Sequence, residues 1–170
     1  MKQGTKRALL VTAILIVVSL RAVSSEAWDG DRKGLVVGVG VGYGYSTFAE
    51  FDNKSGIFTS FKIGYAPNEH IMLLYHGTQN FASIEDRTAI DAVHGLSFQL
   101  YPSKTTNFFV LGGGGYSYFG ITDKKFGYGF KGGAGFDFGN FLGVEGTIQQ
   151  NINDIGNSTS FGITFNIFVY

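Results

Sequence analysis

Histidines, hydroxyls and acids are the residues of this chain that could carry acyl-transfer chemistry. His76 and Thr78 are separated by one residue, and Glu85 follows in the same stretch. A histidine base, a hydroxyl nucleophile and an acid that orients the base are the usual set for activating an oxygen atom. These three residues are therefore the candidate catalytic set, with a threonine in the place that a serine usually takes.

Five charged side chains form a second group that could exchange protons or hold one another in place. They are Lys62, Asp91, Lys131, Asp137 and Glu145. Each shares the small or polar face of an alternating segment, mostly with glycine, serine or threonine. Two lysines and three acids enclosed together are expected to pair, because an unpaired buried charge is costly. We interpret them as a structural network rather than as acid–base catalysts.

Other ligand sites are not indicated. The segment GYGFKG, Gly127–Gly132, has the glycine spacing of a phosphate-binding loop, but GAGFDFG follows it instead of a helix, so we interpret it as a strand. The chain has no cysteine, which excludes disulfides, thiolate metal sites and a lipid-carrying cysteine. The formal net charge is zero, so no basic excess indicates a nucleic-acid partner. We expect no metal and no cofactor.

The first 27 residues are interpreted as a secretory signal peptide, and residues 28–170 as the mature domain. Lys2, Lys6 and Arg7 precede the apolar run Ala8–Leu20, which is too short to span a bilayer comfortably. Small residues at the third and first positions before Trp28 are typical of a cleavage site. The sequence therefore predicts export and removal of residues 1–27.

The elements that must position the candidate residues are predicted to be β-strands. After Trp28, apolar residues alternate with small or polar ones almost everywhere, which places the two sets on opposite faces of a strand. The predicted strands cover residues 34–46, 56–66, 70–81, 89–101, 107–119, 126–138, 141–150 and 159–170. Longer polar loops, 47–55, 82–88, 120–125 and 151–158, alternate with compact turns. This asymmetry predicts an all-β fold, an eight-stranded antiparallel up-and-down transmembrane β-barrel.

The apolar faces are predicted to point outward, toward lipid. The interior of an eight-stranded barrel has just enough room for side chains, and the sixth strand alone would have to place Phe126, Tyr128 and Phe130 inside. Glycines and a few charges fit that interior better. His94 is the exception, because it falls on the apolar face of its strand. We interpret it as a neutral histidine near the lipid interface or as the sign of a local bulge.

On these features the chain resembles the small OmpA/OmpX-like outer-membrane β-barrels of Gram-negative bacteria. The resemblance covers residues 28–170 and rests on the export signal, the eight alternating strands and the C-terminal strand FGITFNIFVY. It implies that Phe168 and Tyr170 belong to the signal read by the outer-membrane assembly machinery. In that family the terminal aromatic shares the outward apolar face, whereas Tyr170 has the opposite parity here. A bulge near Asn166, or an aromatic girdle at the rim, would reconcile the two.

The resemblance implies an integral outer-membrane protein, a monomer in contact with outer-membrane lipids and lipopolysaccharide. The leading interpretation is a structural or surface-interaction barrel with a closed lumen and four outer loops. One alternative is a lipid A-modifying, deacylase-like enzyme, which would need His76, Thr78 and Glu85 on the outer rim. The other is a narrow channel or small-ligand barrel. The charges expected inside argue against a lumen that holds an acyl chain.

Overall fold

The structure, a computed structural model, describes residues 32–48, 53–84, 87–120, 125–139, 141–154 and 156–169. The predicted signal peptide, Glu85 and Tyr170 lie outside these residues. Among the residues described, no helix is long and apolar enough to cross a membrane. The eight strands are β1 (Gly34–Phe48), β2 (Lys54–Asn68), β3 (Ile71–Ile84), β4 (Arg87–Leu100), β5 (Phe108–Gly120), β6 (Lys125–Phe138), β7 (Leu142–Asn153) and β8 (Gly156–Val169).

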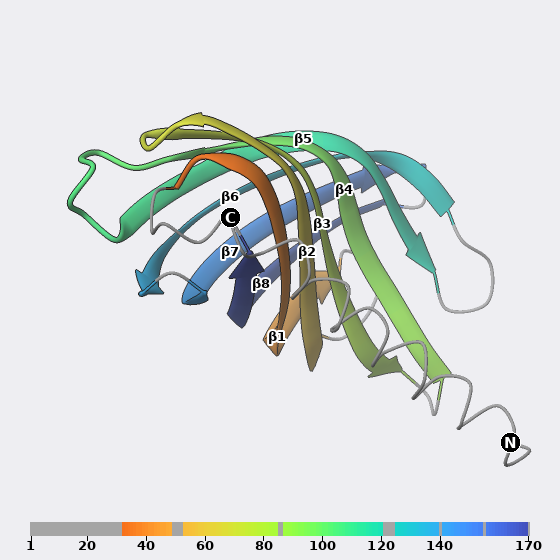
Figure 1. Cartoon of the computed structure of the whole chain (residues 1–170). Helices are drawn as coiled ribbons and strands as arrows, with labels where there is room; N and C mark the ends of the chain where they lie inside the picture. Colours follow the sequence, from red (N-terminus) through yellow and green to blue (C-terminus); the bar gives the residue numbers. More distant parts are fainter. Residues whose placement is uncertain are drawn as a thin grey trace, which may run out of the picture.

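The strands close into one antiparallel barrel, as Figure 1 shows. Each strand pairs with its neighbours in the sequence, and β1 also pairs with β8. Gly40 illustrates the closure, because it lies opposite Ser60 on β2 and opposite Asn166 on β8. Closure leaves no sheet edge whose backbone groups lack partners, which a hydrocarbon environment requires. The predicted eight-stranded up-and-down barrel is confirmed.

The barrel has two ends, which we name by the connections they carry. The turn end holds the start of β1, the end of β8 and the hairpins β2–β3, β4–β5 and β6–β7; the loop end holds the other four connections. At the β6–β7 turn, Gly139 has a φ of 73°, in the left-handed region that glycine adopts without strain.

The predicted contrast between short turns and longer outer loops is wrong. The longest connection, residues 101–107, lies at the turn end, whereas β3 and β4 leave only residues 85–86 between them at the loop end. Residues expected in loops extend the strands instead; Ser83, for example, pairs with Thr88. Continuing the ladder satisfies the backbone groups of these polar residues.

The two faces of the sheet differ as predicted. Leu96 and Phe165 point outward and are 72% and 69% exposed, whereas Lys62 and Glu145 point inward and are 2% and 0% exposed. Every strand contributes exposed large apolar side chains to the outer surface. This phase, apolar outside and polar inside, is the reverse of a soluble barrel and is the arrangement of a transmembrane one.

Apolar side chains nevertheless occupy the interior at the turn end. This turn-end cluster consists of Val36, Ala66, Met72, Leu74, Tyr101, Phe109, Leu111 and Phe168. The sequence predicted small and polar residues on all inward faces, so this is a correction. Packed rings and aliphatic groups fill a narrow interior without needing hydrogen-bond partners.

Glycines on the inward face of β1 make room for the side chains of other strands. A Cβ at Gly40 would overlap the side chains of Ser60 and Asn166. A Cβ at the outward-facing Gly112, by contrast, would meet nothing within 4 Å. The alternating glycines of β1 therefore allow longer side chains to cross the interior beside them.

Candidate functional site in the barrel interior

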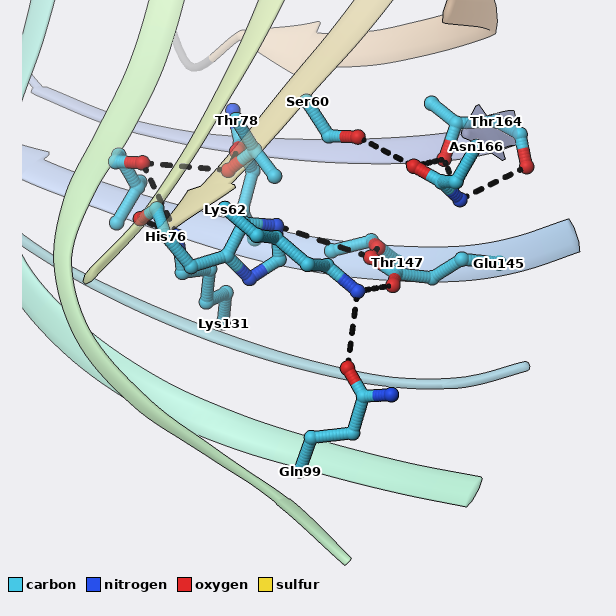
Figure 2. A network of polar contacts seen from close by, with 12 residues as sticks. Ser60, Lys62, His76, Thr78, Gln99, Lys131, Glu145, Thr147, Thr164 and Asn166 are labelled. Carbon is cyan, nitrogen blue, oxygen red and sulfur yellow. Dashed lines mark hydrogen bonds and ion pairs between the residues drawn. The ribbon is translucent and has the colours of Figure 1, made fainter. Parts of the chain in front are cut away.

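A buried ion pair between Lys62 of β2 and Glu145 of β7 lies at the centre of the interior network. The Nζ atom of Lys62 contacts Oε2 of Glu145 and donates to Oε1 of Gln99 at 3.0 Å. Thr147 donates to the other carboxylate oxygen of Glu145 at 2.8 Å. Figure 2 shows these side chains converging from β2, β4 and β7. Such a pair is tolerated in a low-dielectric interior when its remaining polar atoms are also bonded.

Lys131 of β6 is held by backbone carbonyl groups. Its ammonium donates to the carbonyl oxygen of His76 and, at 3.3 Å, to that of Val93. The imidazole of His76 lies beside Glu145, with Nε2 3.8 Å from Oε1. The structure thus gathers Lys62, Lys131, His76 and Glu145 into one cluster, but the close carboxylate contact belongs to Lys62 rather than to both lysines.

Asp91 of β4 lies buried nearer the loop end, among neutral hydrogen-bond donors. Ser158 of β8 and Asn151 of β7 donate to one carboxylate oxygen, each at 3.1 Å, and Ser160 donates to the other. The Oγ atom of Ser160 is also 2.5 Å from that of Ser46 on β1. Hydroxyl and amide dipoles therefore take the place of water around this carboxylate, which makes its burial possible.

Asp137 of β6 is linked to the central ion pair through Tyr101 of the turn-end cluster. Its Oδ2 atom accepts a hydrogen bond of 2.6 Å from the hydroxyl of Tyr101, and that hydroxyl accepts one of 2.6 Å from Gln99. Because Gln99 also accepts from Lys62, a continuous chain of contacts runs from Asp137 to Glu145. The five predicted interior charges therefore all lie inside, but they are linked largely through neutral side chains.

Two members of the predicted catalytic set, His76 and Thr78, lie in the barrel interior. His76 and Thr78 both point from β3 into the interior, and neither has exposed surface. The hydroxyl of Thr78 donates to Oε1 of Gln149 at 2.5 Å and to the carbonyl oxygen of Val93 at 3.3 Å. Glu85 lies outside the described residues. The expected position of His76 and Thr78 on the outer rim is corrected to the barrel interior.

His94 lies on the outer face of β4, and no bulge accompanies it. The register is unbroken there, with His94 opposite Gly77 on one side and Tyr116 on the other. Its ring stacks with Tyr116 and Tyr118 at centroid distances of 5.3 and 5.7 Å, and its Nε2 atom is 3.2 Å from Nε2 of Gln79. A Cβ at Gly77 would be 2.5 Å from the ring nitrogen Nδ1. Neighbouring side chains thus cover a polar ring on an otherwise apolar surface.

Phe168 points into the interior, where it belongs to the turn-end cluster. The register of β8 is continuous through Asn166, which lies opposite Gly40 and Gly143. The bulge that could have reversed the parity of Phe168 and Tyr170 is therefore absent. The role of these two aromatic residues in assembly stays a prediction, and Tyr170 lies outside the described residues.

Sequence reasoning did not single out the neutral residues that complete the network. The most connected are Gln99, Tyr101, Gln149, Asn151 and Ser160. Parity was the available signal, because Gln99 and Tyr101 have the parity of Asp91, and Gln149 and Asn151 that of Glu145. Which of them touch depends on strand register, which alternation alone does not give.

Comparison with known proteins identifies the fold. No protein-family model and no curated sequence matches the chain. Neisserial surface protein A (NspA) is similar with a TM-score of 0.58 and 11% sequence identity, over 80% of this chain and 96% of that one. Ail, the attachment invasion locus protein of Yersinia pestis, has a TM-score of 0.53 and 9% identity, covering 80% of this chain and 99% of Ail.

The outer membrane protein OprG from Pseudomonas aeruginosa has a TM-score of 0.53 and 10% identity, covering 83% of this chain and 99% of OprG. Each of these structures is matched over nearly its whole length, whereas their sequences have little in common with this one. The shared feature is the closed antiparallel barrel. The chain therefore has the fold of the small eight-stranded outer-membrane barrels.

Proposed function

We propose that the mature chain is a small integral outer-membrane barrel with a structural or surface-interaction role and a closed lumen. The observation that carries the proposal is the inverted phase of the sheet. Outward side chains such as Val39 and Phe130, each 58% exposed, would be incompatible with water over so large a surface. Hydrocarbon is the environment that stabilises them.

The interior contacts support a closed lumen. The Lys62–Glu145 pair and its neighbours cross the middle, and the turn-end cluster occupies one end. Direct side-chain contacts between opposite walls leave the charged groups bonded to protein rather than to a column of water. A steady, defined conductance in planar bilayers would contradict this part of the proposal.

The proposed orientation places the turn end in the periplasm and the loop end at the cell surface. The predicted export signal, and the recognition of the C-terminal strand by the assembly machinery that the family resemblance implies, would give that orientation. The proposed partners are outer-membrane lipids and lipopolysaccharide around the barrel wall, and the proposed state is a monomer. No observation favours the lipid A-modifying alternative, since His76 and Thr78 are buried in the interior.

Heat-modifiable migration tests the membrane-barrel proposal. The mature chain, folded in detergent, should migrate differently on a gel before and after boiling, because a closed barrel resists the detergent until it is heated. A mature chain that is monomeric and soluble without detergent would contradict the proposal. Protease protection in intact cells then tests orientation, with a tag inserted at residues 121–124 expected to be cleaved from outside.

A further inference from the structure

Two residues that precede β1, Arg32 and Lys33, make side-chain contacts with turns at the turn end. Arg32 places its guanidinium 4.1 Å from the centre of the Tyr101 ring. It donates hydrogen bonds to the carbonyl oxygen of Thr106 at 2.8 Å and to Oδ1 of Asn107 at 3.2 Å. A longer contact of 3.4 Å reaches the carbonyl oxygen of Lys104. One cation thus binds both the wall and the whole β4–β5 turn.

Lys33 anchors the same segment at a second point. Its ammonium forms an ion pair of 2.7 Å with Glu69 in the β2–β3 turn, and Glu69 also pairs with Lys104 at 2.8 Å. Glu69 therefore joins the segment before β1 to two different turns. Side-chain contacts of this kind tie this segment and two turns of the turn end into one layer.

The contacts of Arg32 connect opposite sides of the barrel mouth. In the closed order β1 to β8, the β4–β5 turn lies across the barrel from β1, so the contacts of Arg32 span the mouth rather than its edge. Directly inside lies the turn-end cluster, in which the Tyr101 ring packs on Phe109 at 5.6 Å. The ring that Arg32 covers therefore belongs to the apolar layer beneath it.

The contact also reaches the central ion pair. The hydroxyl of Tyr101 accepts from Gln99, and Gln99 accepts from Lys62. Moving Arg32 away would expose one face of Tyr101 and free it to shift. The hydrogen bond between Tyr101 and Gln99 would then change. The contact between Gln99 and Lys62 would change with it.

We propose that Arg32 and Lys33 form a strap that holds the turn end of the barrel shut against water. While the strap is bound, the turn-end cluster is dry. When the strap is released, water and small solutes enter the cluster from the turn end. The inference goes beyond the proposed function but rests on it, because it takes the barrel to be folded in a membrane with this end accessible to solvent.

Cysteine accessibility tests the strap, because the chain has no cysteine of its own. A single reporter, Met72→Cys, places a thiol inside the turn-end cluster, where Met72 is buried. The folded barrel in vesicles or detergent is treated with a small, charged, water-soluble thiol reagent. With the strap intact the reporter should react slowly. Adding Arg32→Ala should raise its rate roughly tenfold or more, the change expected when hydrogen bonds to a charged group are lost.

Two matched variants control the experiment. Ser103→Cys, exposed in the β4–β5 turn, should react fast in every background, which shows that the reagent reaches this end. Lys54→Ala removes a cation at the loop end of β2 and should leave the rate of the Met72→Cys reporter unchanged. An equal rise with Lys54→Ala would indicate general loosening and would overturn the strap. So would a rate unaltered by Arg32→Ala.

A second measurement covers the case in which Arg32→Ala does not fold. In the Met72→Cys chain with its strap intact, raising the salt concentration to about 1 M shortens the screening length to roughly 3 Å, which weakens the Lys33–Glu69–Lys104 pairs. The reporter should then react faster, and an unchanged rate would reject the strap. Heat-modifiable migration of the same samples tests the membrane barrel separately, so failure of the strap is distinguishable from failure of the proposed function.

Discussion

The two halves of the barrel interior solve the same packing problem in different ways. At the turn end, rings and aliphatic groups such as Phe109 and Met72 pack together. From the middle to the loop end, most of the interior is filled by charges and neutral polar groups, with Asp91 as the clearest example. The apolar exceptions there are the ring of Phe58 and a small cluster of Ala89 and Phe119. The apolar half depends on close packing, and its side chains need no hydrogen-bond partners. The polar half requires each donor to find an acceptor, so it depends far more on strand register.

This difference predicts that the polar half is the more sensitive to removal of a single partner. Apolar packing degrades gradually when atoms are lost, because neighbours can move into the space. A buried charge that loses its partner stays uncompensated, because neither water nor another charge can replace that partner. Three variants test the comparison, in order of decreasing expected effect, and an acid titration then tests the ion pairs that cover the apolar half.

Breaking the central ion pair should have the largest effect. Glu145→Ala leaves Lys62 and His76 enclosed without their carboxylate. The expected loss in free energy of unfolding is about 3–5 kcal/mol. Urea unfolding of the barrel in lipid vesicles measures it. The double replacement of Lys62→Met with Glu145→Leu should recover most of the loss, and a single variant as stable as the parent would show that the pair contributes little.

Truncation in the turn-end cluster should cost less than the loss of Glu145. Met72→Ala removes a buried side chain at the start of β3. A cost of about 2–3 kcal/mol is expected, in the lower part of the range for such changes, because the cluster borders the mouth and can collapse. Met72→Leu, which nearly conserves volume, is the control. If Met72→Ala proves costlier than Glu145→Ala under the same conditions, the comparison between the halves is reversed.

Removal of one donor to Asp91 should have a smaller effect again. Ser160→Ala takes one hydroxyl from the carboxylate and leaves Ser158 and Asn151 in place. A hydrogen bond to a charged group is worth about 1.5–3 kcal/mol, and the remaining donors should keep the loss near the lower value. Ser160→Thr keeps a hydroxyl and is the control. Equal stability of Ser160→Ala and the parent would mean that the carboxylate does not need this donor.

Acid should release Glu69 from the strap only at very low pH. Hydrogen bonds from Lys104 and then Lys33 lower the pKa of the Glu69 carboxyl to about 2, from a usual 4.5. A lowered folded pKa means that this contribution is complete above pH 4.5 and is lost as the pH falls through about 2. Carbon NMR of the Glu69 carboxyl measures the titration, and Lys104→Ala should move it upward. A midpoint near 4.5 in the parent would show that the pairs do not persist in solution.

The sequence predicted the architecture well because alternation is a local signal. Period two on β6 is enough to separate Phe130 from Lys131 without knowledge of any partner strand. The bounds were less accurate at the loop end, where polar residues such as Ser83 and Thr88 read as a loop but pair as strand. Composition could not distinguish a polar hairpin from a polar loop, because both are rich in the same residues.

The interior could be predicted by parity but not by contact. The alternation pattern predicted that Lys62 and Glu145 both point inward. Whether they form an ion pair depends on the stagger of β2 relative to β7 across the barrel. The turn-end cluster was missed although Val36 shares the parity of the β1 glycines. The strap was missed for a different reason, because Arg32 lies outside any periodic segment and binds a turn far away in the sequence.

The closing seam between β1 and β8 concentrates the long-range cost of folding. Seven ladders join consecutive strands, whereas the seam pairs Val37 with Val169 and the strands at opposite ends of the sequence. Low contact order favours early formation of the consecutive hairpins. The seam forms only when β1 and β8 come together, which costs the chain conformational entropy. An intermediate with seven ladders formed would expose two open edges, one of them the glycine-rich β1. Capture of that edge by another strand would compete directly with completion of the barrel.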